Sequence, residues 1–234
     1  MTIDFNRVRA LSFDCYGTLI DWETGILTAL ADWVAQVGAQ RVLSGFGAIE
    51  PDIEHAHPTW PYRQIVAEVH VEMARELGLA SSRTAATRFA ESIGGWPPFA
   101  DTVDALRRLK SRYRLYILSN VDEVSIAATL RQLGVPFDGV FTAERIGSYK
   151  PDPRNFDYLL ARLADDGIQK HELVHVAQSL FHDHGPAQAA GLHTVWIDRN
   201  SGRPGAARLP DPVPHFDLRF PSLGDFAAAA VTTH

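Results

Sequence analysis

The chain has 234 residues, of which 46% are hydrophobic and 21% charged, and its formal net charge at pH 7 is −6. This composition is typical of a globular protein with a sizeable core, and the acidic balance without a basic block argues against nucleic acid as a partner. No run reaches the ~18 apolar residues of a membrane helix, and no signal-peptide core stands near Met1. The single cysteine, Cys15, excludes an internal disulfide, so we expect a cytoplasmic protein that does not bind membranes.

The first predicted element is a buried strand over residues 8–13 that ends at a carboxylate, Asp14. A short apolar run bounded by turn residues is typical of a strand in a parallel sheet. In open α/β sheets, ligands bind at the carboxyl ends of the strands. Asp14 is therefore the first candidate site residue.

The next stretch is helical in pattern. Apolar residues recur every three or four positions over 26–37, 65–77 and 83–93, whereas residues 39–61 are mixed, with glycines and prolines. This stretch is too long for an ordinary crossover between two strands. We expect residues 21–96 to form a helical cap domain over the carboxyl end of the first strand.

Strands and helices then alternate to the end of the chain. Strands are predicted at 114–118, 139–142, 173–177, 194–197 and 216–220, a loop at 199–214, and an alanine-rich helix at 223–231. Alternation of this kind predicts an α/β fold with a doubly wound parallel sheet. Its core domain would comprise residues 1–20 and 97–234.

Chemically active side chains follow four of the predicted elements. They are Asp14, the Ser119–Asn120 pair, Lys150 and Asp183. Because the carboxyl ends of parallel strands meet at one edge of a sheet, we expect these groups to share one cleft.

The ordered set resembles the haloacid dehalogenase superfamily over nearly the whole chain. Its four motifs correspond to residues 13–19 (FDCYGTL), 118–120 (LSN), 148–152 (SYKPD) and Asp183. The resemblance implies a Rossmann-like core with an inserted helical cap, and it suggests a homodimer.

Two positions separate the branches of that superfamily. Phosphatase members carry a second aspartate where this chain has Tyr16, and a Gly-Asp pair that helps to hold Mg²⁺ where it has Ala177-Gln178. Phosphoryl transfer needs a cation, and Mg²⁺ sites draw on carboxylates that are fewer here. The chain therefore resembles the 2-haloacid dehalogenase branch, metal-free and cofactor-free hydrolases of small halogenated carboxylic acids, and we expect no metal site.

In that scheme Asp14 attacks the halogen-bearing carbon and forms an ester, which water then hydrolyses. Lys150 keeps Asp14 ionised, because a cation within about 4–6 Å favours a carboxylate. Asp183 positions or activates the water, and Thr18 fixes the rotamer of Asp14. Displacement of halide needs no general acid beside the nucleophile, so Tyr16 is free to shape the pocket.

The substrate-binding residues expected beside these are Cys15 and Tyr16 next to the nucleophile, Ser119 for the substrate carboxylate, and Asn120 for the leaving group. Dehalogenases of this branch also carry a halide-binding arginine in the cap. Residues 42–57 contain no Arg or Lys, and Arg63 is the candidate that remains.

The missing arginine leaves other functions open. The leaving group could be another halogen, including fluoride. Alternatively, the enzyme could open the ring of azetidine-2-carboxylate, with a proton donor among His55, His57 and His182. A Mg²⁺-dependent phosphomonoesterase and a catalytically silent binding protein are further candidates, although a silent protein has no need of all four motif residues.

Overall fold

The computed structural model describes residues 3–200 and 210–232. Within these residues, six parallel strands form one sheet in the order β3-β2-β1-β4-β5-β6. The strands are β1 (Ala10–Phe13), β2 (Arg114–Ser119), β3 (Gly139–Thr142), β4 (Leu173–Ala177), β5 (His193–Ile197) and β6 (Leu218–Phe220). The predicted doubly wound α/β class is confirmed. Of the predicted loop at 199–214, residues 201–209 lie outside the described residues.

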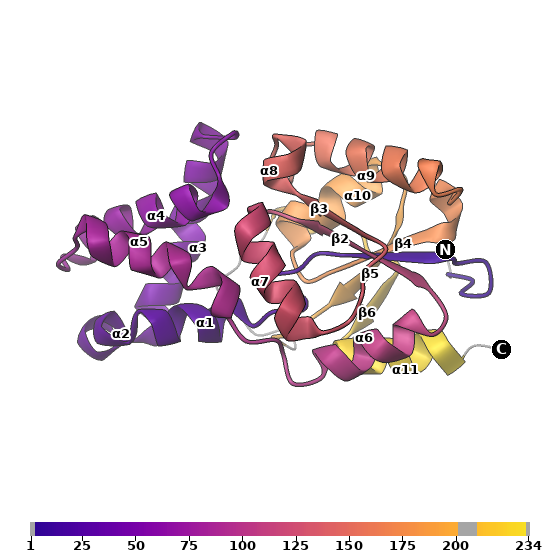
Figure 1. Cartoon of the computed structure of the whole chain (residues 1–234), viewed down its shortest axis with the longest axis horizontal. Helices are drawn as coiled ribbons and strands as arrows, with labels where there is room; N and C mark the ends of the chain where they lie inside the picture. Colours follow the sequence, from indigo (N-terminus) through magenta and orange to yellow (C-terminus); the bar gives the residue numbers. More distant parts are fainter. Residues whose placement is uncertain (1–2, 201–209, 233–234) are drawn as a thin grey trace.

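Helices cover both faces of the sheet (Figure 1). Helices α8 (Ala143–Ile146), α9 (Arg154–Asp165) and α10 (Gly185–Ala189) lie above it in that view, and α6 (Thr102–Lys110) and α11 (Leu223–Thr232) below. Helix α7 (Glu123–Leu133) lies at the end of the sheet that is nearer the helices of residues 22–91.

Alternate residues of each strand pack on opposite faces of the sheet, because successive side chains of a strand point in opposite directions. On β2, Tyr116 and Leu118 join the cluster around α9, and Leu115 and Ile117 join the larger cluster that includes α6 and α11. The central strands are therefore buried on both sides, as the continuous runs in the sequence indicate.

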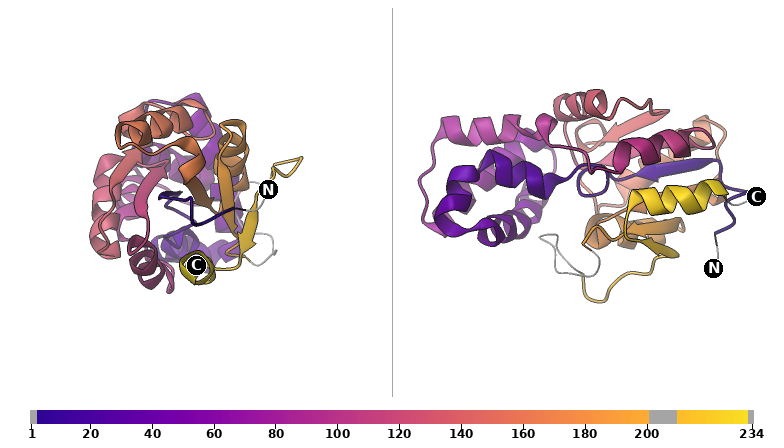
Figure 2. Two further views of the ribbon diagram at one scale, coloured as in Figure 1. Left: turned by 90° about the vertical axis from the view of Figure 1, so that its right-hand side faces the viewer. Right: turned by 90° about the horizontal axis from the view of Figure 1, so that it is seen from below.

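The part of the chain between β1 and α6 forms a helical layer at one end of the molecule (Figures 1 and 2). Its helices are α1 (Trp22–Ala29), α2 (Ala31–Val37), α3 (Ala39–Ala56), α4 (Tyr62–Leu77) and α5 (Arg83–Glu91). The connections to the sheet run side by side, since the Asp21 N–H donates to Pro97 O and the Phe99 N–H to Leu19 O.

The expectation of mixed structure over residues 39–61 is wrong for most of that stretch, because α3 continues to Ala56. Its buried side chains recur every three or four residues along one face that packs on α4: Val42, Leu43, Phe46, Ile49 and Ile53. This packing outweighs the glycines and the hydrogen bond that Pro51 removes from the helix. Within the described residues, no helix is long and apolar enough to cross a membrane.

Close packing of α1 gives a first prediction. A Cβ added at Gly25 would lie 2.3 Å from the buried ring of Trp96, whereas one added at Gly45 of α3 would meet only Met73, at 3.7 Å. We expect Gly25→Ala to lower the free energy of unfolding by about 1–3 kcal/mol through overpacking. Gly45→Ala, the control, should be neutral or stabilising by about 1 kcal/mol through helix propensity. Urea unfolding measures both, and equal effects would contradict the packing.

Candidate active site

Asp14 lies at the carboxyl end of β1 and is 6% exposed. Thr18 Oγ1 donates to Asp14 Oδ2 at 2.8 Å and accepts the N–H of Gln178 at 2.9 Å. The Asp14 N–H donates to Val176 O of the neighbouring strand. These bonds hold both the backbone and the carboxyl group of Asp14, and they give Thr18 the place that the sequence predicts.

The ammonium group of Lys150 joins the two predicted carboxylates. Nζ lies 3.0 Å from Asp14 Oδ1, 2.5 Å from Asp183 Oδ1 and 3.0 Å from Leu118 O. Lys150 is 1% exposed and Asp183 is fully buried. All three ammonium donors are therefore used, which is the condition under which a buried lysine can stay charged.

Burial and these charges act in opposite directions on the three pKa values. Burial raises the pKa of Asp14, and Lys150 opposes the rise. Burial lowers the pKa of Lys150, but Asp14 and Asp183 outweigh it and raise that pKa. Burial would raise the pKa of Asp183, yet Lys150 and His175 hold it below its usual range. Asp183 is therefore the carboxylate most firmly ionised, and Asp14 is a poorly solvated one.

His175 was not singled out in the sequence, where it stands in an apolar strand. It is fully buried on β4, with Nε2 2.9 Å from Asp183 Oδ1 and Nδ1 2.9 Å from Ser12 Oγ. A neutral ring that donates from Nε2 and accepts from Ser12 satisfies both contacts. Lys150 and His175 thus share Oδ1, whereas Oδ2 of Asp183 is buried without a hydrogen-bond partner among the described residues.

A cavity of about 60 Å³ opens onto these groups from the helical layer. Its lining residues are Asp14, Tyr16, Glu50, Tyr62, Ser119, Asn120, Lys150, Ser179, His182 and Asp183. A second cavity of about 80 Å³ shares half of that lining and is otherwise largely aromatic, with Trp22, Phe46 and Trp96. The site therefore joins a polar compartment at the sheet edge to an apolar one under the helices.

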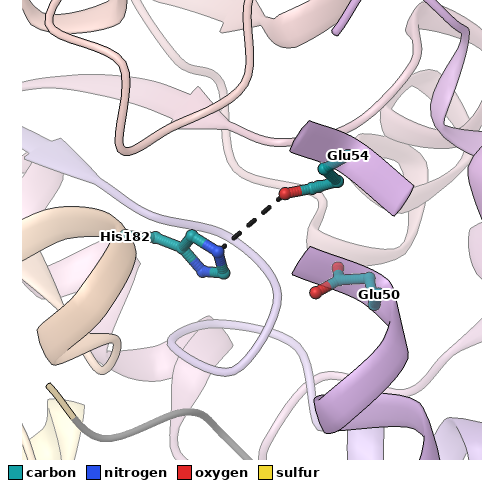
Figure 3. Close-up of side chains that lie close together, drawn as sticks. All are labelled: Glu50, Glu54 and His182. Atoms are coloured by element: carbon teal, nitrogen blue, oxygen red, sulfur yellow. Dashed lines mark ion pairs between the residues drawn. The ribbon is translucent and has the colours of Figure 1, made fainter. Parts of the chain in front are cut away.

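The helical layer contributes carboxyl groups to this region (Figure 3). Glu50 accepts a 2.8 Å hydrogen bond from the Tyr62 hydroxyl, and Glu54 accepts one of 3.1 Å from the Asn120 amide. His182 Nε2 lies 3.9 Å from Glu54. Burial raises the pKa of Glu50 to about 7 and that of Glu54 well above its usual range.

Ligand atoms of Glu50, Glu54 and His182 lie within 4.8 Å of one another, a spacing that could hold a divalent cation. The i, i+4 spacing of the two glutamates would have pointed to one face of a helix. That signal was missed because residues 39–56 were not expected to be helical.

The other predicted substrate-side residues divide into two groups. Ser119 and Tyr16 line the cavity, although the Tyr16 hydroxyl bonds Thr129 at 2.8 Å and its ring packs edge-on against Trp96. Asn120 also lines it, but its amide is engaged by Glu54 and by the backbone of Lys150. Cys15 is fully buried outside the cavity lining, and burial raises the pKa of its thiol.

Arg63 does not take the position expected of a halide ligand. Its Nε lies 3.3 Å from Asp122 Oδ1, and its backbone N–H donates to the same carboxylate. It is not among the residues that line the cavity. Asp122, which caps α7, holds the guanidinium outside the cavity that Asp14 lines.

Comparison with known proteins places this geometry in a family. The sequence profile of haloacid dehalogenase-like hydrolases matches residues 8–191. The chain belongs to the haloacid dehalogenase-like hydrolases. It is therefore a hydrolase of that fold, as the four motifs predict.

Relatives within the family carry different activities. The chain is 29% identical to an (S)-2-haloacid dehalogenase of Pseudomonas fluorescens, over 84% of this chain and 87% of the relative. It is 25% identical to 5-amino-6-(5-phospho-D-ribitylamino)uracil phosphatase of Escherichia coli, over 84% and 86%. A solved defluorinating L-2-haloacid dehalogenase matches 95% of both chains with a TM-score of 0.78 and 26% identity.

The buried ammonium gives the second prediction. Lys150→Met leaves Asp14 and Asp183 without their cation, so we expect a loss of about 3–5 kcal/mol in unfolding free energy at neutral pH. The loss should shrink toward about pH 5, because the unpaired carboxyls then take up protons at raised pKa values. Lys110→Met, which removes a partly exposed pair with Asp138, should cost about 1 kcal/mol or less. Urea unfolding over pH checks this, and similar losses for both variants would contradict it.

Proposed function

We propose that this protein hydrolyses small 2-haloalkanoic acids to 2-hydroxy acids, with Asp14 as nucleophile and without a metal ion. The observation that carries the proposal is the buried Asp14–Lys150–Asp183 array, with Thr18 on the second oxygen of Asp14. Residues 21–96 act as a cap domain over a core of residues 1–20 and 97–234, because Glu50 and Tyr62 of the helical layer complete the cavity.

In the first step, an oxygen of Asp14 attacks C2 from the side opposite the halogen. The C–O bond forms, the carbon–halogen bond breaks, and halide leaves with the electron pair. Asp14 is held by Thr18 and Lys150 and is poorly hydrated, so little solvent must be displaced. Ser119, at the end of β2, and nearby backbone N–H groups bind the substrate carboxylate.

In the second step, water attacks the carbonyl carbon of the ester, the bond between that carbon and the substrate oxygen breaks, and the 2-hydroxy acid leaves with a proton on its new hydroxyl group while Asp14 returns to a carboxylate. Asp183 takes the water proton on Oδ2, the oxygen left without a partner among the described residues. Lys150, 3.0 Å from Asp14 Oδ1, stabilises negative charge on the carbonyl oxygen as it develops. His175 holds Oδ1 of Asp183 and so aims Oδ2.

The phosphatase alternative finds less support in the donor set. The position of its general acid is occupied by Tyr16, whose hydroxyl is bonded to Thr129. Asp14 and Asp183 each give an oxygen to Lys150, and Gln178 supplies no carboxylate beside them. These residues do not fit a Mg²⁺ site built on oxygen ligands around the nucleophile.

Hydrolytic ring opening of azetidine-2-carboxylate is the second candidate. It is favoured by the carboxyl groups of Glu50 and Glu54, which would face a basic ring nitrogen better than a departing chloride. Both candidates use Asp14 in the same way and differ only in the atom that leaves.

The third prediction concerns the nucleophile. Asp14→Asn should lower turnover at least about 10⁴-fold, because an amide oxygen is a weak nucleophile. The assay measures halide and fluoride release from both enantiomers of short 2-haloacids, with and without EDTA. Release of halide at the wild-type rate by Asp14→Asn would contradict the proposed attack by Asp14. Ring opening of azetidine-2-carboxylate without release of any halide would favour the second candidate, and turnover of p-nitrophenyl phosphate that EDTA inhibits would favour a metal-dependent phosphatase.

The fourth prediction separates the two chemical steps. His175→Leu should slow ester hydrolysis about tenfold or more with a smaller effect on ester formation, because His175 acts only through Asp183. Mass spectrometry of the peptide that carries Asp14 should then show the ester accumulating during turnover. His175→Gln, which can still donate to Asp183, should restore part of the rate. His70→Leu, a buried histidine in α4, is the control; equal slowing of both steps would indicate a general structural effect.

A further inference from the structure

Arg199 is a buried cation near the nucleophile that the proposed mechanism leaves unused. It lies two residues after β5, its side chain is 8% exposed, and its guanidinium carbon lies 4.0 Å from the centre of the Phe99 ring. Nε and Nη2 donate to Thr18 O at 3.1 and 2.7 Å. Nη1 donates to both carboxylate oxygens of Asp101, at 2.7 and 3.0 Å. The guanidinium group therefore joins two segments of the chain that are distant in sequence.

Thr18 is the residue through which Arg199 reaches the nucleophile. Thr18 is fully buried, and its Oγ1 donates to Asp14 Oδ2 while it accepts the N–H of Gln178. Among the described residues, the only hydrogen bonds to Thr18 O come from Arg199. A buried carbonyl group needs such a donor. Arg199 thus fixes the backbone of the residue whose side chain fixes Asp14.

The turn after β1 has few other attachments to the rest of the sheet. Its own backbone bonds close it on itself, since the N–H groups of Leu19 and Ile20 both donate to Cys15 O. Those bonds set the shape of the turn and leave its position relative to β5 open. The two bonds from Arg199 supply that restraint.

The other end of the guanidinium group holds the chain that returns from the helical layer. Asp101 lies just before α6, and its Oδ2 also accepts the N–H of Gly224 in α11. The two connections to the helical layer are joined close by, where the Phe99 N–H donates to Leu19 O. Arg199 therefore ties the turn beside the nucleophile to both the returning connection and α11.

We propose that Arg199 is a positioning residue for Asp14, which acts through Thr18 and sets the rate of ester formation. This inference rests on the proposed attack by Asp14. The attacking oxygen must lie in line with the carbon–halogen bond, and a displacement of about 1 Å can cost about 100-fold in rate. Arg199 lines neither of the two cavities at the site, so its loss leaves the contacts of a bound substrate in place.

The geometry requires an arginine at this position. A guanidinium group is a planar fork that can donate to Thr18 O from one edge and to Asp101 from another. The ammonium group of Arg199→Lys keeps the charge and cannot reproduce both sets of bonds. We therefore expect Arg199→Lys to lose most of the rate that Arg199→Ala loses.

The experiment measures chloride release from 2-chloropropionate in single turnovers with the enzyme in excess. Halide leaves in the first step, so this rate reports ester formation without ester hydrolysis. We expect Arg199→Ala to lower the maximal rate constant about 100-fold and to change the half-saturating enzyme concentration less than about threefold. Millimolar guanidinium chloride should restore part of the rate by occupying the vacated place, and ammonium chloride should not.

Arg112→Ala is the matched control. Arg112 also donates to backbone carbonyl groups, those of Ala230 and Val231, but it stands two residues before β2 and so at the opposite edge of the sheet from Asp14. Its variant should lower the urea midpoint and leave the rate of ester formation unchanged. An unchanged rate in Arg199→Ala, a loss shared equally by Arg112→Ala, or a loss in binding alone would overturn the inference. If Arg199→Ala does not fold, a wild-type rate in Arg199→Lys would overturn it.

A wild type that releases no halide would refute the proposed function, and the positioning role is then measured by hydrogen exchange. Exchange at the amides of Leu19, Ile20 and Gln178 should be faster in Arg199→Ala than in the wild type, because their bonds depend on the position of the turn. Guanidinium chloride should slow it again, and Arg112→Ala should leave it unchanged. Equal exchange in Arg199→Ala and the wild type would show that Arg199 does not hold the turn.

Discussion

The buried ammonium of Lys150 is the constraint on which the site depends. A lysine that is 1% exposed remains charged only if nearby groups replace its hydration, and here Asp14, Asp183 and Leu118 O do so. The same contacts make each carboxylate tolerable in the interior. None of the three ionised groups is stable there without the others, so Asp14 and Asp183 both depend on the same lysine.

Strand order explains why these residue types stand where they do. β1 lies between β2 and β4, so Asp14, Ser119 and the turn that carries Asp183 leave the sheet as neighbours. β3 lies one strand further out, and Lys150 follows it. A side chain that reaches Asp14 from there must pass the end of β2, which is where Leu118 O accepts its third hydrogen bond. A long flexible lysine meets this requirement, and a short side chain could not.

The side of the cavity where we expect the leaving group to lie is formed by other elements and is stabilised by other interactions. Its groups come from α3 and α4, which are held by an apolar face and by aromatic contacts such as Tyr62 with Tyr149. Here the carboxyl groups of Glu50 and Glu54 lie close together with His182 Nε2 3.9 Å from Glu54, and burial raises the pKa values of both glutamates. The surroundings of Asp14 are thus held by ion pairs with Lys150, whereas the carboxyl groups of α3 are held by hydrogen bonds from Tyr62 and Asn120.

Much of this protein is determined by local sequence. Strand β4 was predicted at residues 173–177, and Asp14, Lys150 and Asp183 were expected in one cleft, because short apolar runs that end in polar residues specify parallel strands and their carboxyl ends. The sequence did not predict helix α3, the site position of His175 or the pairing of Arg63. Helix α3 forms because its packing against α4 outweighs the effect of its glycines and Pro51. The sequence around His175 does not indicate that Ser12 and Asp183 lie beside it in the fold. Arg63 pairs with Asp122, which belongs to an element distant in sequence. The sequence alone therefore determined the fold class and the carboxylate that we propose as nucleophile. Only the tertiary structure decided which charges meet on the leaving-group side, because that depends on how two separately packed layers approach each other.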